Sequence, residues 1–120
     1  MSNNFAIYPM YLDTDTTVVA NTNWRGSSGG LIQGAFTKGI IPTKIILTEA
    51  ASGTAVVAGT VVVSDPQSST ELWSFTVQTS GAVTSLPLVF DLTWGSSLWR
   101  DFIVTGLGAT KCALQVYYKY

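Results

Sequence analysis

Residues 111–120 read KCALQVYYKY, and their side chains alternate between two faces with the two-residue period of a β-strand. One face carries Cys112, Leu114, Val116, Tyr118 and Tyr120. The other carries Lys111, Ala113, Gln115, Tyr117 and Lys119. The first face is apolar or aromatic throughout, whereas the second holds both lysines. The stretch therefore predicts a strand that buries one face and exposes the other.

Similar short runs, many of them rich in Val and Thr, follow one another along the chain. Branching at Cβ favours the pleated strand over the helix. Clusters of Gly, Ser, Asp and Asn separate the runs and predict turns. We expect strands at residues 5–12, 16–21, 31–36, 43–49, 55–63, 71–78, 86–92, 102–107 and 111–120. In the strand at 71–78, Trp73, Phe75 and Val77 share one face, which predicts that Trp73 belongs to the core.

Several local features predict how these strands are connected. The turn at residues 51–54 favours a hairpin between the strands 43–49 and 55–63, with a second turn at 64–69. Pro9 predicts that its strand lies at a sheet edge or contains a bulge, and Pro87 predicts an edge strand, since proline donates no backbone hydrogen bond. Gly59 suggests a bulge or a close backbone approach. Residues 94–101 form a connection, with one helical turn expected at 97–100.

The pattern as a whole predicts an all-β fold. About nine short strands with regular turn signals and no sustained helical period favour a single antiparallel β-sandwich, jelly-roll-like or Ig-like. A closed barrel is the second choice. The length of 120 residues suits one domain spanning residues 1–120.

Charge is scarce in this chain, at 11% of residues, with 47% hydrophobic residues and no histidine. The absence of histidine excludes histidine-based general bases and imidazole metal ligands, and we expect no enzyme and no cofactor. The six basic residues are scattered, so nucleic acid is not an expected partner. No apolar stretch is long enough to span a membrane, and residues 1–4 do not resemble a secretory signal. Cys112 is the single cysteine, which we expect to be buried.

Three further groups of residues bear on catalysis or ligand binding. A pair of carboxylates can hydrolyse glycosides, but the seven carboxylates of this chain fall mostly at turns or strand ends, where solvated side chains are the usual finding. Asp13 and Asp15 have the spacing that opens a calcium loop, but the rest of that loop is missing and a β-turn explains them equally well. The glycine-rich residues 26–30 lack the lysine and helix of a phosphate-binding loop. No catalytic or metal-binding residue is predicted.

Aromatic side chains in connections and near residue 120 are the candidates for contact with a partner or ligand. Such rings stack on sugars or anchor interfaces, although tryptophans in connections can equally cap the open end of a sandwich. The candidate contact residues are Trp24, Arg25, Trp94, Trp99, Tyr117 and Tyr120.

Over residues 1–120 the sequence resembles, in its composition, the capsid decoration (cement) proteins of tailed bacteriophages and related β-sandwich virion proteins. The similarity lies in its start, MSNNFAIYPMYLDTDTTVVA, its Thr/Val/Ala/Gly strands, its lack of histidine, and its last residues, LQVYYKY. The resemblance implies trimers or other homo-oligomers that bind to the capsid surface. There they would hold neighbouring capsomers together against internal pressure. The implied partner is the major capsid protein or another virion protein.

The sequence thus leads to a non-enzymatic structural protein of a virion as the first functional hypothesis. A weakly charged surface costs little to desolvate against a partner, and uncharged strand edges invite pairing between chains. The alternative is a carbohydrate-binding module or a lectin-like phage spike or head-fibre domain that uses tryptophans in its loops.

Overall fold

The computed structural model of the protein describes residues 9–18, 24–25, 31–32, 39–50, 55–81, 85–92 and 98–119. These residues form ten strands and one short helix. The elements are β1 (Met10–Leu12), β2 (Thr16–Val18), β3 (Trp24–Arg25), β4 (Leu31–Ile32), β5 (Ile41–Glu49), β6 (Gly59–Ser64), β7 (Glu71–Val77), β8 (Leu88–Asp91), β9 (Phe102–Thr105), α1 (Leu107–Thr110) and β10 (Cys112–Lys119).

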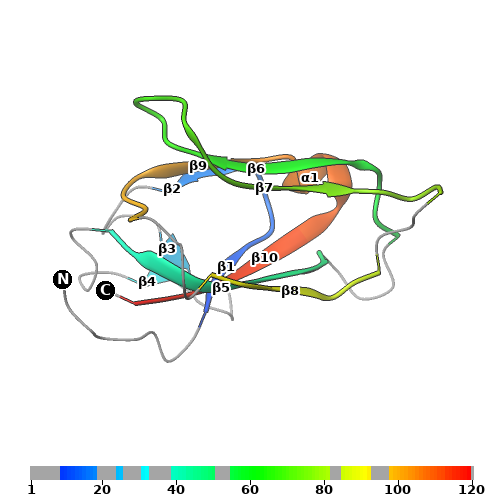
Figure 1. The fold of residues 1–120 in the computed structure, drawn as a ribbon, viewed down its shortest axis with the longest axis horizontal. Helices are drawn as coiled ribbons and strands as arrows, with labels where there is room; N and C mark the ends of the chain where they lie inside the picture. Colours follow the sequence, from blue (N-terminus) through cyan, green and yellow to red (C-terminus); the bar gives the residue numbers. More distant parts are fainter. Residues whose placement is uncertain are drawn as a thin grey trace.

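Two antiparallel sheets of four strands make up most of the structure. The first sheet has the order β1-β10-β5-β8, the second has the order β2-β9-β6-β7, and β3 and β4 pair separately. Figure 1 shows the two sheets as two layers, with α1 at one end of the second sheet. The all-β prediction is confirmed, and in the part of the chain described here neither sheet closes into a barrel.

Strand pairing follows a nested pattern along the chain. When β3 and β4 are set aside, the first strand pairs with the last (β1 with β10), and β2 pairs with β9. Further inside, β5 pairs with β8 and β6 pairs with β7. Two cross-pairings, β10 with β5 and β9 with β6, join these pairs into the two sheets. The chain therefore folds back on itself as a long antiparallel ribbon that curls into two layers.

This pairing contradicts the hairpin predicted between residues 43–49 and 55–63. β5 belongs to the first sheet and β6 to the second, so the chain crosses between layers where a tight turn was expected. β6 also begins only at Gly59, and before it Val57 donates its N–H to the carbonyl oxygen of Thr110 at 2.9 Å. The apolar faces of β5 and β6 are buried against each other's sheet, across the two layers.

The core lies between the two sheets and confirms the predicted buried face of β10, whereas Ala113, on the face expected to be exposed, is buried as well. In β10, Cys112, Leu114, Val116 and Tyr118 are buried, as expected. The wider core includes Met10, Leu12, Ile40, Ile45, Leu47, Val61, Val63, Val77, Trp99, Phe102, Val104 and Leu107. Trp73 faces this core as predicted but is only partly buried.

Both prolines mark edge strands, as predicted. β1, which follows Pro9, and β8, which follows Pro87, are the two outer strands of the first sheet. Gly59 marks a close approach: a Cβ built on it would lie 3.0 Å from the Thr110 methyl carbon. The irregularity in β6 lies elsewhere, between Val63 and Ser64.

The helical turn expected at residues 97–100 is not present at residues 98–100. There, Trp99 forms an isolated bridge with Ile40, with N–H···O distances of 2.7 and 2.8 Å between the two backbones. The helix is α1 instead, where the strand predicted at residues 102–107 has already ended at Thr105.

Asp15 fixes the start of α1 from a distant part of the chain. Its carboxylate accepts hydrogen bonds from the N–H groups of Gly106 at 3.2 Å and Gly108 at 3.1 Å. These donors have no partner within the helix, because the first N–H groups of any helix lie beyond its own carbonyls. Asp15 therefore acts as a structural cap that ties the start of β2 to the end of β9.

Candidate functional site

The outer face of the first sheet carries a row of uncharged side chains that crosses all four strands. Tyr11 of β1 lies opposite Gln115 of β10, Gln115 lies opposite Ile46 of β5, and Ile46 lies opposite Val89 of β8. We call these four residues the outer row. Val89 is 61% exposed, and Ile46 is half-buried. Side chains opposite one another in neighbouring strands lie side by side, so the row forms one continuous strip.

A second row beside it contains Tyr117, Lys44 and Asp91, which face one another in register. The ammonium group of Lys44 lies 4.3 Å from the centre of the Tyr117 ring. A cation over an exposed aromatic ring contributes about 0.5–1 kcal/mol. With Asp91 on its other side, Lys44 has both an aromatic and an acidic neighbour within the sheet. The outer face therefore combines an uncharged strip with locally balanced charge.

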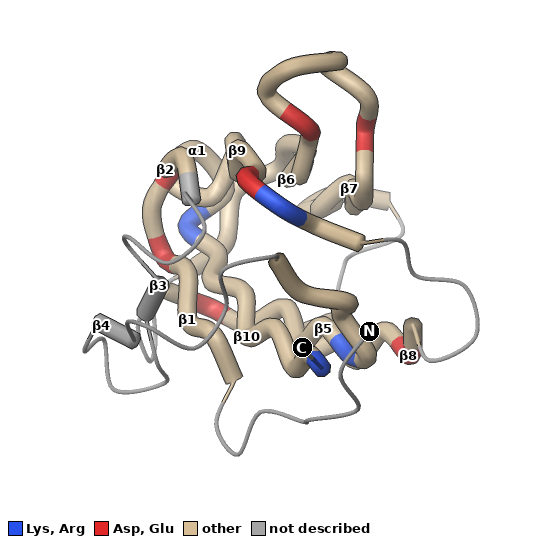
Figure 2. Tube along the Cα trace, turned by 90° about the vertical axis from the view of Figure 1, so that its left-hand side faces the viewer, with Lys and Arg blue, Asp and Glu red and all other residues tan. Residues whose placement is uncertain are grey.

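Elsewhere the charges follow the turns and strand ends. Figure 2 shows the basic and acidic residues mainly at connections and strand ends. Asp13, Asp15 and Asp65 lie outside the strands. Lys44, inside β5, is an exception. The outer row itself carries no charge, and this lowers the cost of removing water from it.

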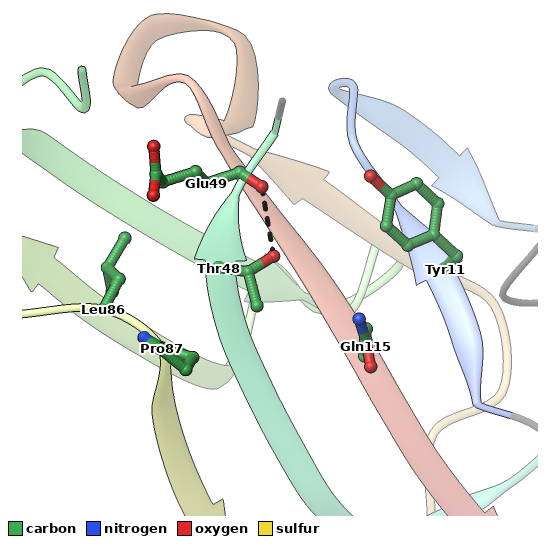
Figure 3. Close-up of a pocket in the computed structure, with 6 residues that line it drawn as sticks. All are labelled: Tyr11, Thr48, Glu49, Leu86, Pro87 and Gln115. Atoms are coloured by element: carbon green, nitrogen blue, oxygen red, sulfur yellow. Dashed lines mark hydrogen bonds between the residues drawn. The ribbon is translucent and has the colours of Figure 1, made fainter. Parts of the chain in front are cut away.

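A shallow pocket of about 360 Å³ lies beside the outer row and shares Tyr11 and Gln115 with it. Its lining residues are Tyr11, Thr48, Glu49, Leu86, Pro87 and Gln115. Figure 3 shows Tyr11 and Gln115 on one side, Leu86 and Pro87 on the other, and Thr48 and Glu49 between them. The Thr48 hydroxyl donates a hydrogen bond to the backbone oxygen of Glu49 at 3.2 Å. The pocket offers an aromatic ring, an amide and a carboxylate to anything that enters it.

Tyr11 is the titratable group of this pocket with a shifted pKa. Burial raises the pKa of its phenol, and the negative charge of nearby Asp13 adds to the increase. The neutral hydroxyl donates to the carbonyl oxygen of Ala50 at 3.5 Å. Tyr11 therefore contributes a neutral phenol at physiological pH.

The described residues contain no cluster of three or more acidic, cysteine or histidine side chains that could hold a metal ion. Asp15, considered above for calcium, is hydrogen-bonded to Gly106 and Gly108. Cys112 is buried, as predicted, with its thiol 3.6 Å from the carbonyl oxygen of Thr110. These groups are part of the structural framework.

The six contact residues expected from the sequence differ in where the structure places them. Tyr117 lies on the outer face, next to the outer row. Trp24 and Arg25 form β3, and their side chains lie outside the described part, as do Trp94 and Tyr120 entirely. Trp99 does not lie at the surface as a contact residue would: its side chain is 1% exposed and packs on Phe102, with ring centres 5.2 Å apart. For Trp99 the structure supports the packing alternative.

The outer row could not be predicted from the sequence. In residues 86–92, Val89 alternates with Leu88 and Phe90, but alternation within one strand does not show which residues of other strands lie beside it. The structure leaves Val89 exposed, with Leu88 and Phe90 only partly buried on the other face. Ile46 lies in the apolar run Ile45–Leu47, which shows no alternation at all.

No helix in the described residues is long and apolar enough to cross a membrane. Comparison of the chain with protein-family models, curated protein sequences and solved structures finds no match.

Proposed function

We propose that the chain is a single jelly-roll β-sandwich domain that serves as a non-enzymatic structural protein of a virion. In this proposal it binds at the capsid surface, between copies of the major capsid protein, and stabilises the head as an oligomer. The resemblance of the sequence to phage decoration proteins and the architecture of the domain both support this assignment.

The nested pairing supports the jelly-roll form over the Ig-like form. A jelly roll consists of eight strands in two sheets with Greek-key connections, and it occurs in viral capsid and lectin domains. Pairing of the first strand with the last, and of each strand inward with its counterpart, generates this arrangement. An Ig-like sandwich places its strands in a different order. Since one fold serves many functions, the functional part of the proposal needs a surface as well.

The observation that carries the functional proposal is the outer row. The cores of protein interfaces are depleted in charge and enriched in aromatic residues. Tyr11, Gln115, Ile46 and Val89 provide an uncharged strip across the full width of the first sheet, with Tyr117 beside it. A flat face of this kind suits attachment to another protein surface, and its low charge keeps desolvation inexpensive.

The direct test of the proposal uses purified particles. Mass spectrometry of virions is expected to detect the chain, and the purified protein is expected to bind particles that lack it. The variant Val89→Glu should lose this binding. Val57→Glu is the matched control, because Val57 is also an exposed large hydrophobic residue, at 44%, but lies outside both sheets. Equal binding by the two variants, or no binding by the unmodified protein, would contradict the proposal.

The pocket favours carbohydrate binding as the second candidate function. Sugar rings stack on aromatic side chains, and amide and carboxylate groups bind their hydroxyls. Tyr11, Gln115 and Glu49 supply these groups. A glycan array should identify a ligand if this candidate is right, and Tyr11→Ala should abolish its binding while Tyr117→Ala keeps it. An array without any positive glycan would remove this candidate.

A further inference from the structure

We infer that the edge strand β7 is the site where a second copy of this chain binds, by antiparallel strand pairing around a two-fold axis. This inference deepens the proposed assembly function by naming the contact between copies.

β7 differs from the other three edge strands. Within the described residues, β1 and β2 have three residues each, and β8 has four. Pro9 precedes β1, Asp15 precedes β2, and Pro87 precedes β8, which also ends in Asp91. Short length, proline and charge are the devices by which proteins protect sheet edges from pairing. β7 has seven residues, no proline, and a single charge, at its first residue Glu71.

Among the residues that the structure describes, none pairs with the outer backbone of β7. In the described part of the chain, β7 pairs only with β6, and the remaining backbone hydrogen bonds involve no residue of β7. In an antiparallel edge strand, alternate residues direct their N–H and C=O groups away from the sheet. A partner strand would satisfy these groups directly, and main-chain bonds of this kind provide the affinity when a strand is added to a sheet.

An incompletely covered apolar layer lies next to this edge. Trp73 and Phe75 of β7 contact Phe90 of β8, with ring centres 5.3 and 5.2 Å apart. These contacts place the edges of the two sheets on the same side of the molecule. All three rings are only partly buried, as are Leu86, Leu88 and Leu92 on the β8 side. Additional coverage along β7 would therefore bury aromatic surface as well as the backbone, and each aromatic ring that is covered adds a large apolar area.

A second copy is the occupant that fits this edge. Two identical edges in antiparallel orientation are self-complementary, and a two-fold axis closes the assembly without leaving a free binding surface. A register centred on Ser74 places Leu72 opposite Thr76 of the second copy, and Trp73 opposite its Phe75. Glu71 then lies opposite Val77, so like charges do not meet. The two second sheets would join into one continuous sheet.

The test is a measurement of molar mass by size-exclusion chromatography with light scattering over a range of concentrations. The unmodified protein is expected to reach a mass near twice the 12.8 kDa of one chain. Ser74→Lys places two like charges opposite each other at the axis and should give the monomer mass. Ser74→Glu should do the same. An equimolar mixture of the two variants should recover the dimer, because opposite charges then face each other.

Thr60→Lys is the matched control for position. Thr60 is exposed on the outer face of β6, directly opposite Thr76 of β7, but it lies one strand away from the edge. It is expected to leave the dimer intact, and circular dichroism should show that all variants are folded. A monomeric unmodified protein, equal loss of the dimer in Ser74→Lys and Thr60→Lys, or a mixture that stays monomeric would each overturn the inference. Because this measurement uses isolated protein, failure of dimerisation is distinguishable from failure to bind capsids.

Discussion

Asp15 shows how one surface residue can hold two distant segments together. Its two carboxylate oxygens accept one hydrogen bond each, from Gly106 and from Gly108. Asn at this position offers a single oxygen acceptor, so Asp15→Asn should lose one of the two bonds. We expect its free energy of unfolding to fall by about 0.5–1.5 kcal/mol, measured by urea denaturation.

Asp13→Asn is the control for this measurement, because Asp13 is exposed two residues earlier and its substitution removes the same charge. Its free energy of unfolding should change by no more than about 0.5 kcal/mol. Similar losses in both variants would mean that charge, and not the cap, is responsible.

Gly106 is a position at which only glycine fits without strain. Its φ of 90° lies in the left-handed region, and a Cβ built on it would collide with the carbonyl oxygen of Thr60. Gly106→Ala should therefore lower the free energy of unfolding by about 2 kcal/mol or more. At Gly108 the nearest heavy atom to a new Cβ is Asp15 Oδ1, at 4.0 Å. Gly108→Ala should be neutral or raise stability by up to about 1 kcal/mol, since alanine favours a helix.

The raised pKa of Tyr11 predicts a dependence of stability on alkaline pH. In the unfolded chain the phenol titrates near its ordinary value of 10.0, whereas in the folded protein burial and Asp13 keep it protonated to higher pH. Its contribution to stability is complete below pH 10 and is lost as the pH rises through the folded pKa. Chemical denaturation of the unmodified protein should show a steeper loss above pH 10 than Tyr11→Phe. Parallel curves would contradict the assignment.

At the scale of elements, β10 organises the first sheet because it lies between β1 and β5. Leu114 points from it into the core and is fully buried, whereas Gln115 belongs to the outer row. Leu114→Ala should lower the free energy of unfolding by about 2–5 kcal/mol. Gln115→Ala should change it by no more than about 0.5 kcal/mol, in the same denaturation assay. A large loss at Gln115 would indicate that the strand is inverted.

The elements that could be predicted are those whose signal is local. β7, β8 and β10 were found from alternation within each strand, and Pro9 and Pro87 correctly marked edges. The hairpin between β5 and β6 was wrong because a turn-like sequence says nothing about which sheet receives the next strand. Trp99 was assigned to a connection because its neighbours show no period, and its burial depends on Ile40, which is distant in the chain.

At the scale of the whole molecule, the candidate site depends on strand order and register, which no short stretch of the sequence specifies. Of the two proposed contacts whose side chains the structure describes, Trp99 is buried and Tyr117 lies on the outer face. Tyr11, Ile46 and Val89 become neighbours only when four strands that are far apart in the chain adopt their order and register. Their apolar character was visible beforehand, but an apolar strand residue is usually assigned to the core.

The nested pairing of the strands also has a consequence for the rate of folding. The first sheet joins Leu12 to Leu114, so its outermost pair closes a loop that contains nearly the whole chain. Folding slows as contacts become more distant in sequence, and β-rich domains of this kind fold in roughly milliseconds to seconds. Stopped-flow refolding monitored by tryptophan fluorescence should give rates in this range. During synthesis on the ribosome, β1 has no pairing partner until β10 has been made. Until then its apolar side chains stay exposed to water unless another part of the chain or a chaperone covers them.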